Sequence, residues 1–404
     1  MEDDELFNCG RGSVFTSAGT IEMEASVMVT STVPSRDITD KSAGMKRGAG
    51  VICIRNVRHP IQLARELLFR TGQDERGNPV DIDDGGGGMH CQLSGPYVED
   101  LARSWGLEFK PDEWFWTERR WQEHRRGLGE EDDTDTIPRA EGGHTYPSQG
   151  TVGCVCLDQW GDLAVATSTG GLTNKFPGRV GDTPTLGAGF WAESWDVEVD
   201  DTVTSSMGRF ENMQYIPQHR ADSVPAAVAK PIWDMTLADC LPGPSQLLRE
   251  IFEPHRGLNT RLRSQQLLIN RKPGQPRKKR RAVAVSGTGN GDSFLRTAAA
   301  RTTCAMMRFS QQERNLADAV TAVAGAGGEL QRSAGRRWGR TGEGQGGIIG
   351  IEADLDDKGT AVAKGLRRGK VVFDFNCGGM YRAWIEEDGD GREIERVMVF
   401  KEPY

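Results

Sequence analysis

The sequence lacks the features that mark several classes of protein. None of its 404 residues belongs to a run approaching the ~20 consecutive apolar residues of a membrane-spanning helix. None of its eight cysteines forms a Cys-x-x-Cys pair, so the spacing predicts neither a zinc site nor a disulfide framework. Five of the cysteines lie in apolar or glycine-rich runs, where buried, reduced thiols are expected. The five are Cys9, Cys154, Cys156, Cys304 and Cys377.

Basic residues are not in excess either. The formal net charge is −8, whereas binding of nucleic-acid phosphates requires a basic surface. Nucleic acid is therefore not an expected partner. A membrane is not an expected partner either, because the sequence has no membrane-spanning run. The chain opens with the acidic segment Met1–Glu5, which does not resemble a signal peptide, so a cytoplasmic location is expected. Apolar residues make up 37% of the chain, which is low but sufficient for a core.

The hydrophobic pattern predicts a mixture of strands and helices. Residues 151–158 and 163–169 should form a hairpin. Residues 127–150 have the composition of a linker. Residues 195–281 look like an irregular insertion that ends in a basic run at 277–281. This run is expected to be a solvated loop, with a nuclear address or a phosphate-binding patch as alternatives. Further strands are expected at 27–29, 48–54, 282–285, 347–352 and 371–376, and helices from 59 and at 96–105, 112–126, 244–252, 292–310 and 312–324.

The Gly150-Thr151 bond is the most informative position in the chain. A threonine freed at its amino end carries a hydroxyl nucleophile and an α-amine base on one residue. An α-amine has a pKa of about 7.7–8.0, so it can accept the hydroxyl proton near neutral pH. Self-cleavage would begin when the Thr151 hydroxyl attacks the Gly150 carbonyl, and it would end when water hydrolyses the resulting ester. Glycine tolerates a strained conformation at such a bond.

Several short segments occur together in an order and spacing that resemble one family, the isoaspartyl peptidase/L-asparaginase family of N-terminal-nucleophile hydrolases. They are Phe-Asn-Cys-Gly-Arg-Gly-Ser-Val-Phe at 7–15, Lys-Arg-Gly-Ala-Gly at 46–50, Gly-Thr-Val-Gly at 150–153, Thr-Ser-Thr-Gly-Gly at 167–171, Gly-Arg-Val-Gly-Asp-Thr-Pro at 178–184, Gly-Ala-Gly at 187–189, Ser-Gly-Thr-Gly at 286–289 and the run from Phe375 to Trp384.

The resemblance implies an α+β fold, specifically a four-layer αββα sandwich. It implies an α-subunit of residues 1–150, a β-subunit of residues 151–404, and a dimer of such αβ units. The implied activity is hydrolysis of the asparagine side-chain amide, of β-aspartyl (isoaspartyl) peptide bonds, or of both. The substrate would be a small amino acid or dipeptide.

The resemblance also implies roles for individual residues. Thr151 would be the nucleophile, Thr169 would hydrogen-bond to it, Thr167 would help to orient it, and Asn8 would support it from the α-subunit.

The substrate would be held at both of its charges. Arg179 would bind the α-carboxylate through its planar fork, and Asp182 would pair with the α-ammonium. Thr288 and the Gly289 amide would form the oxyanion hole. No cofactor is implied except a structural sodium ion, held by backbone carbonyls of the loop that contains Glu2, Asp4, Phe7, Cys9 and Arg11.

The sequence departs from the family pattern in two places. The family begins with a strand and a His-Gly-Gly-Ala-Gly segment before this loop, so the chain is expected to be truncated at its N-terminus. The insertion at 195–281 also separates motifs that the family keeps close.

Three other functions remain open. A glycosylasparaginase-type amidase is favoured by the stretch from Gly289 to Asp292, whereas the second glycine of the 167–171 motif favours an asparaginase. A threonine aspartase is less consistent, because that branch lacks the aspartate corresponding to Asp182. A non-catalytic remnant would follow from the missing N-terminal strand.

Overall fold

The structure is a computed structural model. It describes residues 1–31, 47–70, 90–129, 150–158, 161–199, 277–310, 314–356, 369–388, 390 and 392–401. The parts of the chain before Asp200 and after Arg277 cluster as one compact unit. The elements discussed below build this unit.

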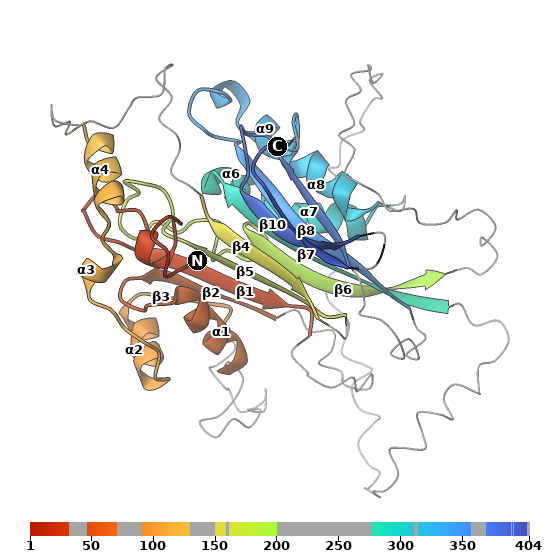
Figure 1. Cartoon of the computed structure of the whole chain (residues 1–404), viewed down its shortest axis with the longest axis horizontal. Helices are drawn as coiled ribbons and strands as arrows, with labels where there is room; N and C mark the ends of the chain where they lie inside the picture. The colour runs from red at the N-terminus through yellow and green to blue at the C-terminus, as the bar shows by residue number, and fades with distance from the viewer. Residues whose placement is uncertain are drawn as a thin grey trace, which may run out of the picture. The chain divides into compact units, whose positions relative to one another are not determined.

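Five strands form the first sheet, in the order β3-β2-β1-β5-β4 (Figure 1). All neighbours are antiparallel except β2 and β3. The central strand β1 pairs with β5, so the middle of the sheet joins a strand from each side of Gly150. The strands are β1 (Met23–Val29), β2 (Arg47–Ile54), β3 (Gln92–Ser94), β4 (Val152–Leu157) and β5 (Leu163–Thr169).

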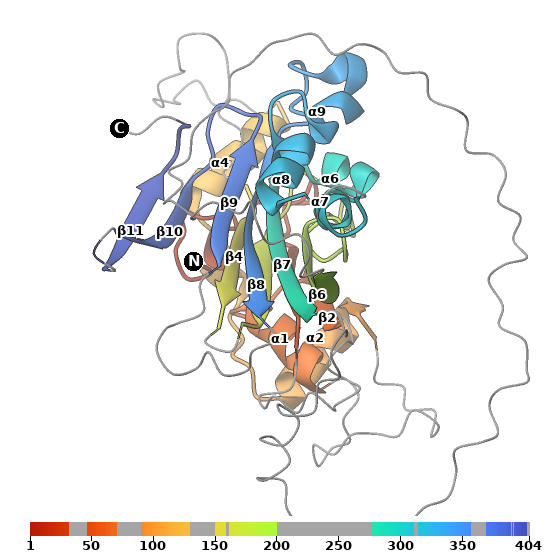
Figure 2. The ribbon, with the colours of Figure 1, turned by 90° about the vertical axis from the view of Figure 1, so that its right-hand side faces the viewer.

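The second sheet has the order β6-β7-β8-β9. Its strands β7, β8 and β9 are antiparallel neighbours. A separate antiparallel hairpin, β10 with β11, follows near the C-terminus (Figure 2). The strands are β6 (Phe190–Val199), β7 (Arg277–Gly289), β8 (Gly346–Asp356), β9 (Lys370–Phe375), β10 (Arg382–Glu387) and β11 (Glu393–Met398).

Each sheet has its own helices. Helix α1 (Pro60–Arg70) packs against the first sheet through a buried face that includes Leu63 and Leu67, and its proline stands at the first helical position. Helices α7 (Ala299–Arg308) and α8 (Leu316–Ala324) pack their apolar faces with the second sheet. The remaining α-helices are α2 (Pro96–Ser104), α3 (Asp112–Phe115), α4 (Glu118–Gly127), α6 (Gly291–Thr297) and α9 (Glu329–Ser333).

A third apolar cluster contains side chains from both sheets. Met28 and Val165 come from the first sheet, and Phe190 and Ala284 from the second, and all four are fully buried. The two sheets therefore share a core, and their mixture with helices makes the fold α+β.

The hairpin expected at 151–169 and the helices expected from residue 59 and at 96–105 are present. Two other predicted helices are broken. The helix expected at 112–126 is interrupted by extended backbone at Trp116 and Thr117, whose hydroxyl caps α4 by accepting the Arg120 N–H at 3.4 Å. The helix expected at 292–310 is interrupted at Ala298, which has a φ of +45°.

The structure describes a strand at each end of the insertion expected at 195–281. Strand β6 runs to Val199, and the basic run at 277–281 is the first part of β7 rather than a loop. From Lys279 onward this segment pairs with β8. Arg281 is 7% exposed, and its Nη2 lies 2.6 Å from Glu352 Oε1. The helix expected at 244–252 and most of the linker expected at 127–150 lie outside the described residues.

The expectation of buried thiols is confirmed for Cys9 and Cys304 and is wrong for Cys154 and Cys156. The last two lie on β4, which is the terminal strand of its sheet, and they are exposed. The described cysteines form no disulfide with one another. Strand β3, helix α9 and the β10–β11 hairpin were not expected from the sequence pattern.

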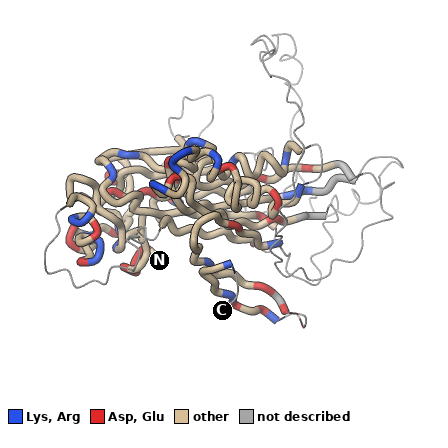
Figure 3. The backbone as a smooth tube through the Cα atoms, turned by 90° about the horizontal axis from the view of Figure 1, so that it is seen from above, with Lys and Arg blue, Asp and Glu red and all other residues tan. Residues whose placement is uncertain are grey.

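Acidic and basic residues are interspersed along the backbone in the view of Figure 3. Of the described helices, none combines the length and the apolar character needed to cross a lipid bilayer.

Candidate active site

The predicted cleavage site lies directly before β4. The register of β4 with β5 pairs Val152 with Ser168 and Gly153 with Thr167. One step further along this register, Thr151 faces Thr169. Because side chains alternate along a strand, Thr151 lies on the same face as Gly153. Thr151 is half-buried and Gly150 is exposed, so water can reach the bond between them.

The end of β7 reaches this bond. A methyl group built on the Gly150 Cα would lie 2.8 Å from Thr288 Oγ1 and 3.8 Å from the Gly289 nitrogen. Gly289 has a φ of +143°, and a side chain there would collide with the backbone of Gln345 and Gly346. The structure therefore brings the predicted oxyanion pair, Thr288 and Gly289, beside the predicted scissile bond.

Thr167 connects the two sheets next to this position. Its side chain is 1% exposed, and Thr167 Oγ1 lies 3.1 Å from Ser286 Oγ on β7. Opposite Thr167, the Gly153 Cα is so close to Ser286 that a methyl group would overlap the serine side chain. Ser286 is therefore part of the site, although the sequence pattern suggested no role for it beyond its place in the motif at 286–289.

Asn8 holds the turn that follows Thr169. Its Nδ2 donates to the Gly171 carbonyl at 2.8 Å, and its own carbonyl accepts the Gly170 N–H at 3.0 Å. The Gly171 N–H in turn donates to Thr169 Oγ1 at 3.0 Å. Asn8 is 1% exposed, and its Oδ1 accepts the Val14 N–H at 3.1 Å. Asn8 thus supports Thr169 through the turn and not by direct contact with its hydroxyl.

Arg179 and Asp182 meet at the start of α6. A methyl group on the Gly291 Cα would lie 2.5 Å from Asp182 Oδ1 and 3.0 Å from Arg179 Nη2. The Arg179 side chain is 17% exposed and pairs with Asp292 at 3.1 Å. The turn from Gly289 to Asp292 therefore connects the oxyanion pair to the two charges predicted to hold the substrate.

Asp182 lies near the buried Glu24, which in turn interacts with the buried Lys175. Burial, with a further contribution from the Glu24 charge, raises the pKa of Asp182 to about 7. Glu24 is 1% exposed, its Oε1 accepts the Gly181 N–H at 2.8 Å, and burial raises its pKa. Lys175 is 5% exposed and donates to the Glu22 carbonyl at 2.6 Å, and burial lowers its pKa.

The sequence pattern did not identify Glu24 or Lys175. The available signal was a carboxylate inside the apolar run of β1, where Glu24 pairs with Thr169 across the sheet. Glu24 Oε2 is buried and has no hydrogen-bond partner among the described residues.

The loop from Glu2 to Arg11 folds tightly on itself. The carbonyls of Glu2, Asp4 and Cys9 each accept one backbone N–H, from Arg11, Phe7 and Gly12 respectively, at 2.8–3.3 Å. The Glu2 carboxylate is also buried, and it accepts hydrogen bonds from the Ser168 hydroxyl and the Ile61 N–H.

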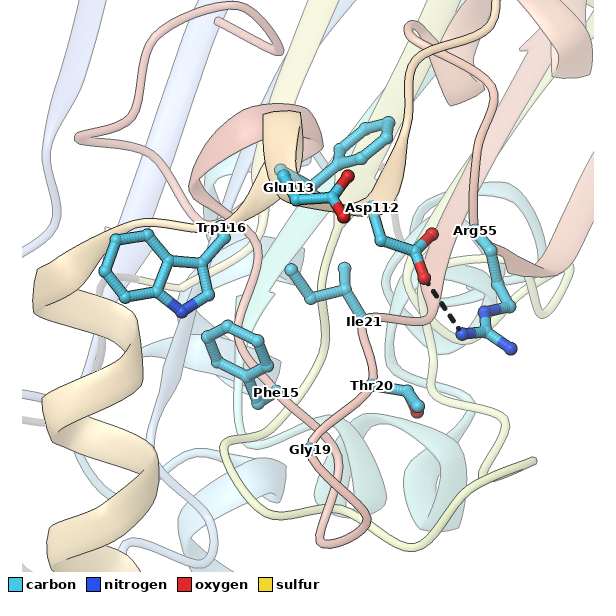
Figure 4. A pocket seen from close by; sticks show the side chains of 9 residues that line it. Phe15, Gly19, Thr20, Ile21, Arg55, Asp112, Glu113 and Trp116 are labelled. Carbon is cyan, nitrogen blue, oxygen red and sulfur yellow. Dashed lines mark hydrogen bonds and ion pairs between the residues drawn. The ribbon is translucent and has the colours of Figure 1, made fainter.

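A cavity of about 420 Å³ lies against the loop at 15–21 and helix α3 (Figure 4). Arg55 and Asp112 form an ion pair at 3.4 Å within its lining. None of the predicted site residues lines this cavity.

The family model described as "Asparaginase" matches residues 1–75 and 84–202. This range contains Gly150, Thr151, Thr169, Arg179 and Asp182, while Thr288 and Gly289 join them through the fold.

Curated proteins match over similar lengths. A putative isoaspartyl peptidase/L-asparaginase of Dictyostelium discoideum is 34% identical over 230 residues, which cover 50% of this chain and 58% of that protein. An isoaspartyl peptidase/L-asparaginase of Rattus norvegicus is 36% identical over 194 residues, covering 48% of this chain and 47% of that protein. An isoaspartyl peptidase of Salmonella typhimurium is 35% identical over 210 residues, covering 51% and 56%. The chain spans about half the length of these relatives. Over residues 1–75 and 84–202, the chain is similar to the asparaginase family.

Proposed function

We propose that this chain is a self-cleaving threonine hydrolase that acts on the asparagine side-chain amide, on β-aspartyl peptide bonds, or on both. The observation that carries the proposal is the position of Gly150 beside Thr288 and Gly289, with Thr151 on the strand position that faces Thr169. The names of the matched relatives, isoaspartyl peptidase and L-asparaginase, support the same substrate class.

Maturation would cut the chain once. The Thr151 hydroxyl attacks the Gly150 carbonyl carbon, the C–N bond breaks, and the acyl group passes from nitrogen to oxygen. Water then hydrolyses the ester and leaves a new carboxylate on Gly150 and a free amine on Thr151. The exposure of Gly150 gives water access to that ester.

Turnover would repeat this chemistry on a substrate. The neutral α-amine of Thr151 accepts the hydroxyl proton, and the hydroxyl oxygen attacks the side-chain carbonyl. The Thr288 hydroxyl and the Gly289 N–H stabilise the oxyanion. Ammonia or a peptide amine leaves with the proton, and water then releases aspartate from the acyl-enzyme.

Selectivity would come from the charged end of the site. Arg179 binds the α-carboxylate and Asp182 binds the α-ammonium, so a substrate must present both groups. Thr167, Thr169 and Asn8 position the nucleophile and do not contact the substrate.

The architecture and assembly follow from the same proposal. The two sheets with their shared core and separate helical coverings support a four-layer αββα sandwich of an α-subunit (1–150) and a β-subunit (151–404), with two such units forming a dimer. The free thiols of the described cysteines favour a cytoplasmic location.

A structural sodium ion is part of the proposal. Carbonyl oxygens suit a hard cation, and those of Glu2, Asp4 and Cys9 each keep a second lone pair after accepting one N–H. Together with the carbonyls of Phe7 and Arg11, these carbonyls would hold the ion. The ion would in turn neutralise the carbonyl dipoles of this tight loop.

The stretch from Gly289 to Asp292 gives less support to a glycosylasparaginase in the structure than in the sequence. Asn290, which belongs to the stretch that favoured it, accepts hydrogen bonds from the Ser293 N–H at 3.1 Å and the Ser293 hydroxyl at 2.8 Å. Its side chain is thus the N-cap of α6 and is not presented to a sugar.

The proposal is tested by the intact mass and the N-terminal residue of the purified full-length protein. A β-chain that begins at Thr151 is expected, together with release of ammonia from asparagine or of amine from a β-aspartyl dipeptide. Thr151→Ala should abolish both, while Thr151→Ser, which keeps a hydroxyl, should retain measurable cleavage. Normal processing of Thr151→Ala would contradict the proposal. Release of sugar from glycosylasparagine, with no activity on the other substrates, would favour a glycosylasparaginase-type amidase. A wild-type protein that stays full-length would favour a non-catalytic protein.

A further inference from the structure

Two exposed thiols lie side by side on β4. Cys154 and Cys156 are both exposed, and their sulfur atoms are 3.4 Å apart. Residues two apart on a strand point to the same face. The intervening Val155 points the other way, and with Leu157 it packs against the core cluster shared by the two sheets. The strand is therefore anchored by its inner face, and it presents both sulfurs outward.

The distance between the sulfurs distinguishes two kinds of chemistry. A disulfide needs an S–S distance of about 2.05 Å and Cβ atoms about 3.8 Å apart. Positions two apart on an extended strand are separated by about 6.6 Å along the chain, at the upper limit of the Cα separation for a disulfide. Closing the disulfide would therefore bend β4 away from its register with β5.

Chelation of a single atom requires no such bending. With sulfur bonds of about 2.3 Å, a tetrahedral centre would hold two sulfurs about 3.8 Å apart. The observed 3.4 Å matches a somewhat smaller angle at the central atom. Trivalent arsenic, which is pyramidal and three-coordinate, has such an angle and binds sulfur strongly.

In the described part of the chain, the two sulfurs have no third side-chain ligand beside them. Among the residues that the structure describes, no group of three or more His, Cys, Asp and Glu side chains is placed to hold a metal ion. The hydrogen bond between the two sulfurs lowers the pKa of Cys156 to about 6 and raises that of Cys154, which favours the thiolate form at Cys156.

We propose that Cys154 and Cys156 form a two-sulfur binding site for a trivalent arsenical. With phenylarsine oxide as the probe, two S–H bonds and the arsenic–oxygen bond break, two As–S bonds form, and one water leaves. Arsenic remains trivalent, so no oxidant or reductant is needed, and the phenyl group occupies the third position. The site is independent of the threonine chemistry, because the sulfurs lie on the face of β4 opposite to Thr151 and Gly153.

The test is intact mass and thiol counting on the full-length protein after incubation with phenylarsine oxide. One phenylarsine per chain is expected, with the loss of two titratable thiols. The adduct should resist excess monothiol and be removed by a small dithiol. Cys154→Ala and Cys156→Ala should each weaken retention by about 100-fold, because a single sulfur lacks the advantage of a second, intramolecular attachment.

Cys91 supplies the matched control, since it is a single exposed thiol. Cys91→Ser should keep full retention. All three positions are exposed, so these variants should fold, which a thermal melt checks. Retention of the arsenical by the Cys154→Ala/Cys156→Ala double variant would overturn the proposal, as would its removal from the wild-type protein by monothiol.

Discussion

The candidate site consists of two regions with different chemistry. Around Thr151 and Thr169 the side chains are hydroxyls and an amide, held by neutral hydrogen bonds to glycine-rich backbone. Around Arg179 and Asp182 they are charged groups taken out of water, including Glu24. Under the proposed function, bond cleavage would need only the first region, because the scissile bond of the precursor is already in place. Substrate selection would need the second region, because a free amino acid brings its own charges. The comparison predicts that maturation and turnover can be separated by mutation.

The largest expected difference between the effects on maturation and on turnover is that of a substitution at Arg179. Arg179→Ala should lower kcat/KM for asparagine by about 100-fold, because a hydrogen bond to a charged group contributes about 1.5–3 kcal/mol. Cleavage before Thr151 should proceed at its normal rate, since the precursor presents no carboxylate to this side chain. Steady-state kinetics and intact mass measure the two effects. Asp292→Asn is the matched control, because it removes the negative charge of the partner of Arg179 and leaves the guanidinium in place. Equal losses of cleavage and turnover in Arg179→Ala would break the distinction between the two regions.

A smaller effect concerns the pH dependence that Asp182 imposes. Its pKa is raised to about 7, and binding of an ammonium group requires the ionised carboxylate, so kcat/KM should rise about tenfold per pH unit below pH 7 from this group alone. The Thr151 amine adds a second rise, because only its neutral form, above a pKa of about 7.7–8.0, accepts the hydroxyl proton. The wild-type log profile should therefore approach a slope of two, and that of Asp182→Asn a slope of one.

The same carboxyl makes a prediction for folding. An acid whose pKa is higher in the folded state holds its proton there more tightly than in the unfolded chain. Its contribution to stability is therefore present at low pH and is lost as the pH rises from about 4 through about 7. Denaturant melts across this range should show the loss in the wild-type protein and a reduced loss in Asp182→Asn. An unchanged pH dependence in the variant would show that Asp182 is not the group responsible.

The smallest expected effect lies in the neutral region. Thr167→Val removes one partner of the buried hydrogen bond to Ser286 and should cost about 1 kcal/mol of stability. It should slow maturation and turnover by similar, several-fold factors, because both use the same nucleophile. The Thr167→Val/Ser286→Ala double variant should recover part of the stability, since no buried hydroxyl is then left without a partner. Additive losses in this double-mutant cycle would exclude the contact as a source of the effect.

Much of the fold could be predicted where the signal is local. The apolar face of α1 and the alternating strands of the β4–β5 hairpin follow from periodicity within a few residues. The order of short motifs predicted the resemblance to this family before any geometry was known, and the family model matches residues 1–75 and 84–202.

The errors arise where distant partners decide the structure. The basic run at 277–281 reads as a loop by composition, but it is a strand because β8, some seventy residues later, pairs with it. Ala298 is a good helix former that nevertheless adopts a positive φ between α6 and α7. Glu24 and Lys175 reveal their part in the site only through burial, which sequence does not show. Cys154 and Cys156 are exposed because β4 ends its sheet.

The pairing of β1 with β5 has a consequence for what a cut at Gly150 can achieve. The register runs from Glu24 and Thr169 to Val29 and Ala164, through the interior of the sheet. A cut at Gly150 lies outside this register, so it leaves the hydrogen bonds between β1 and β5 intact. The two pieces would then separate only when the sheet itself unfolds, so dilution would not release them and they would behave as a single folding unit. In chromatography they should elute together at nanomolar concentration, and a cut protein would be told from an uncut one only after denaturation.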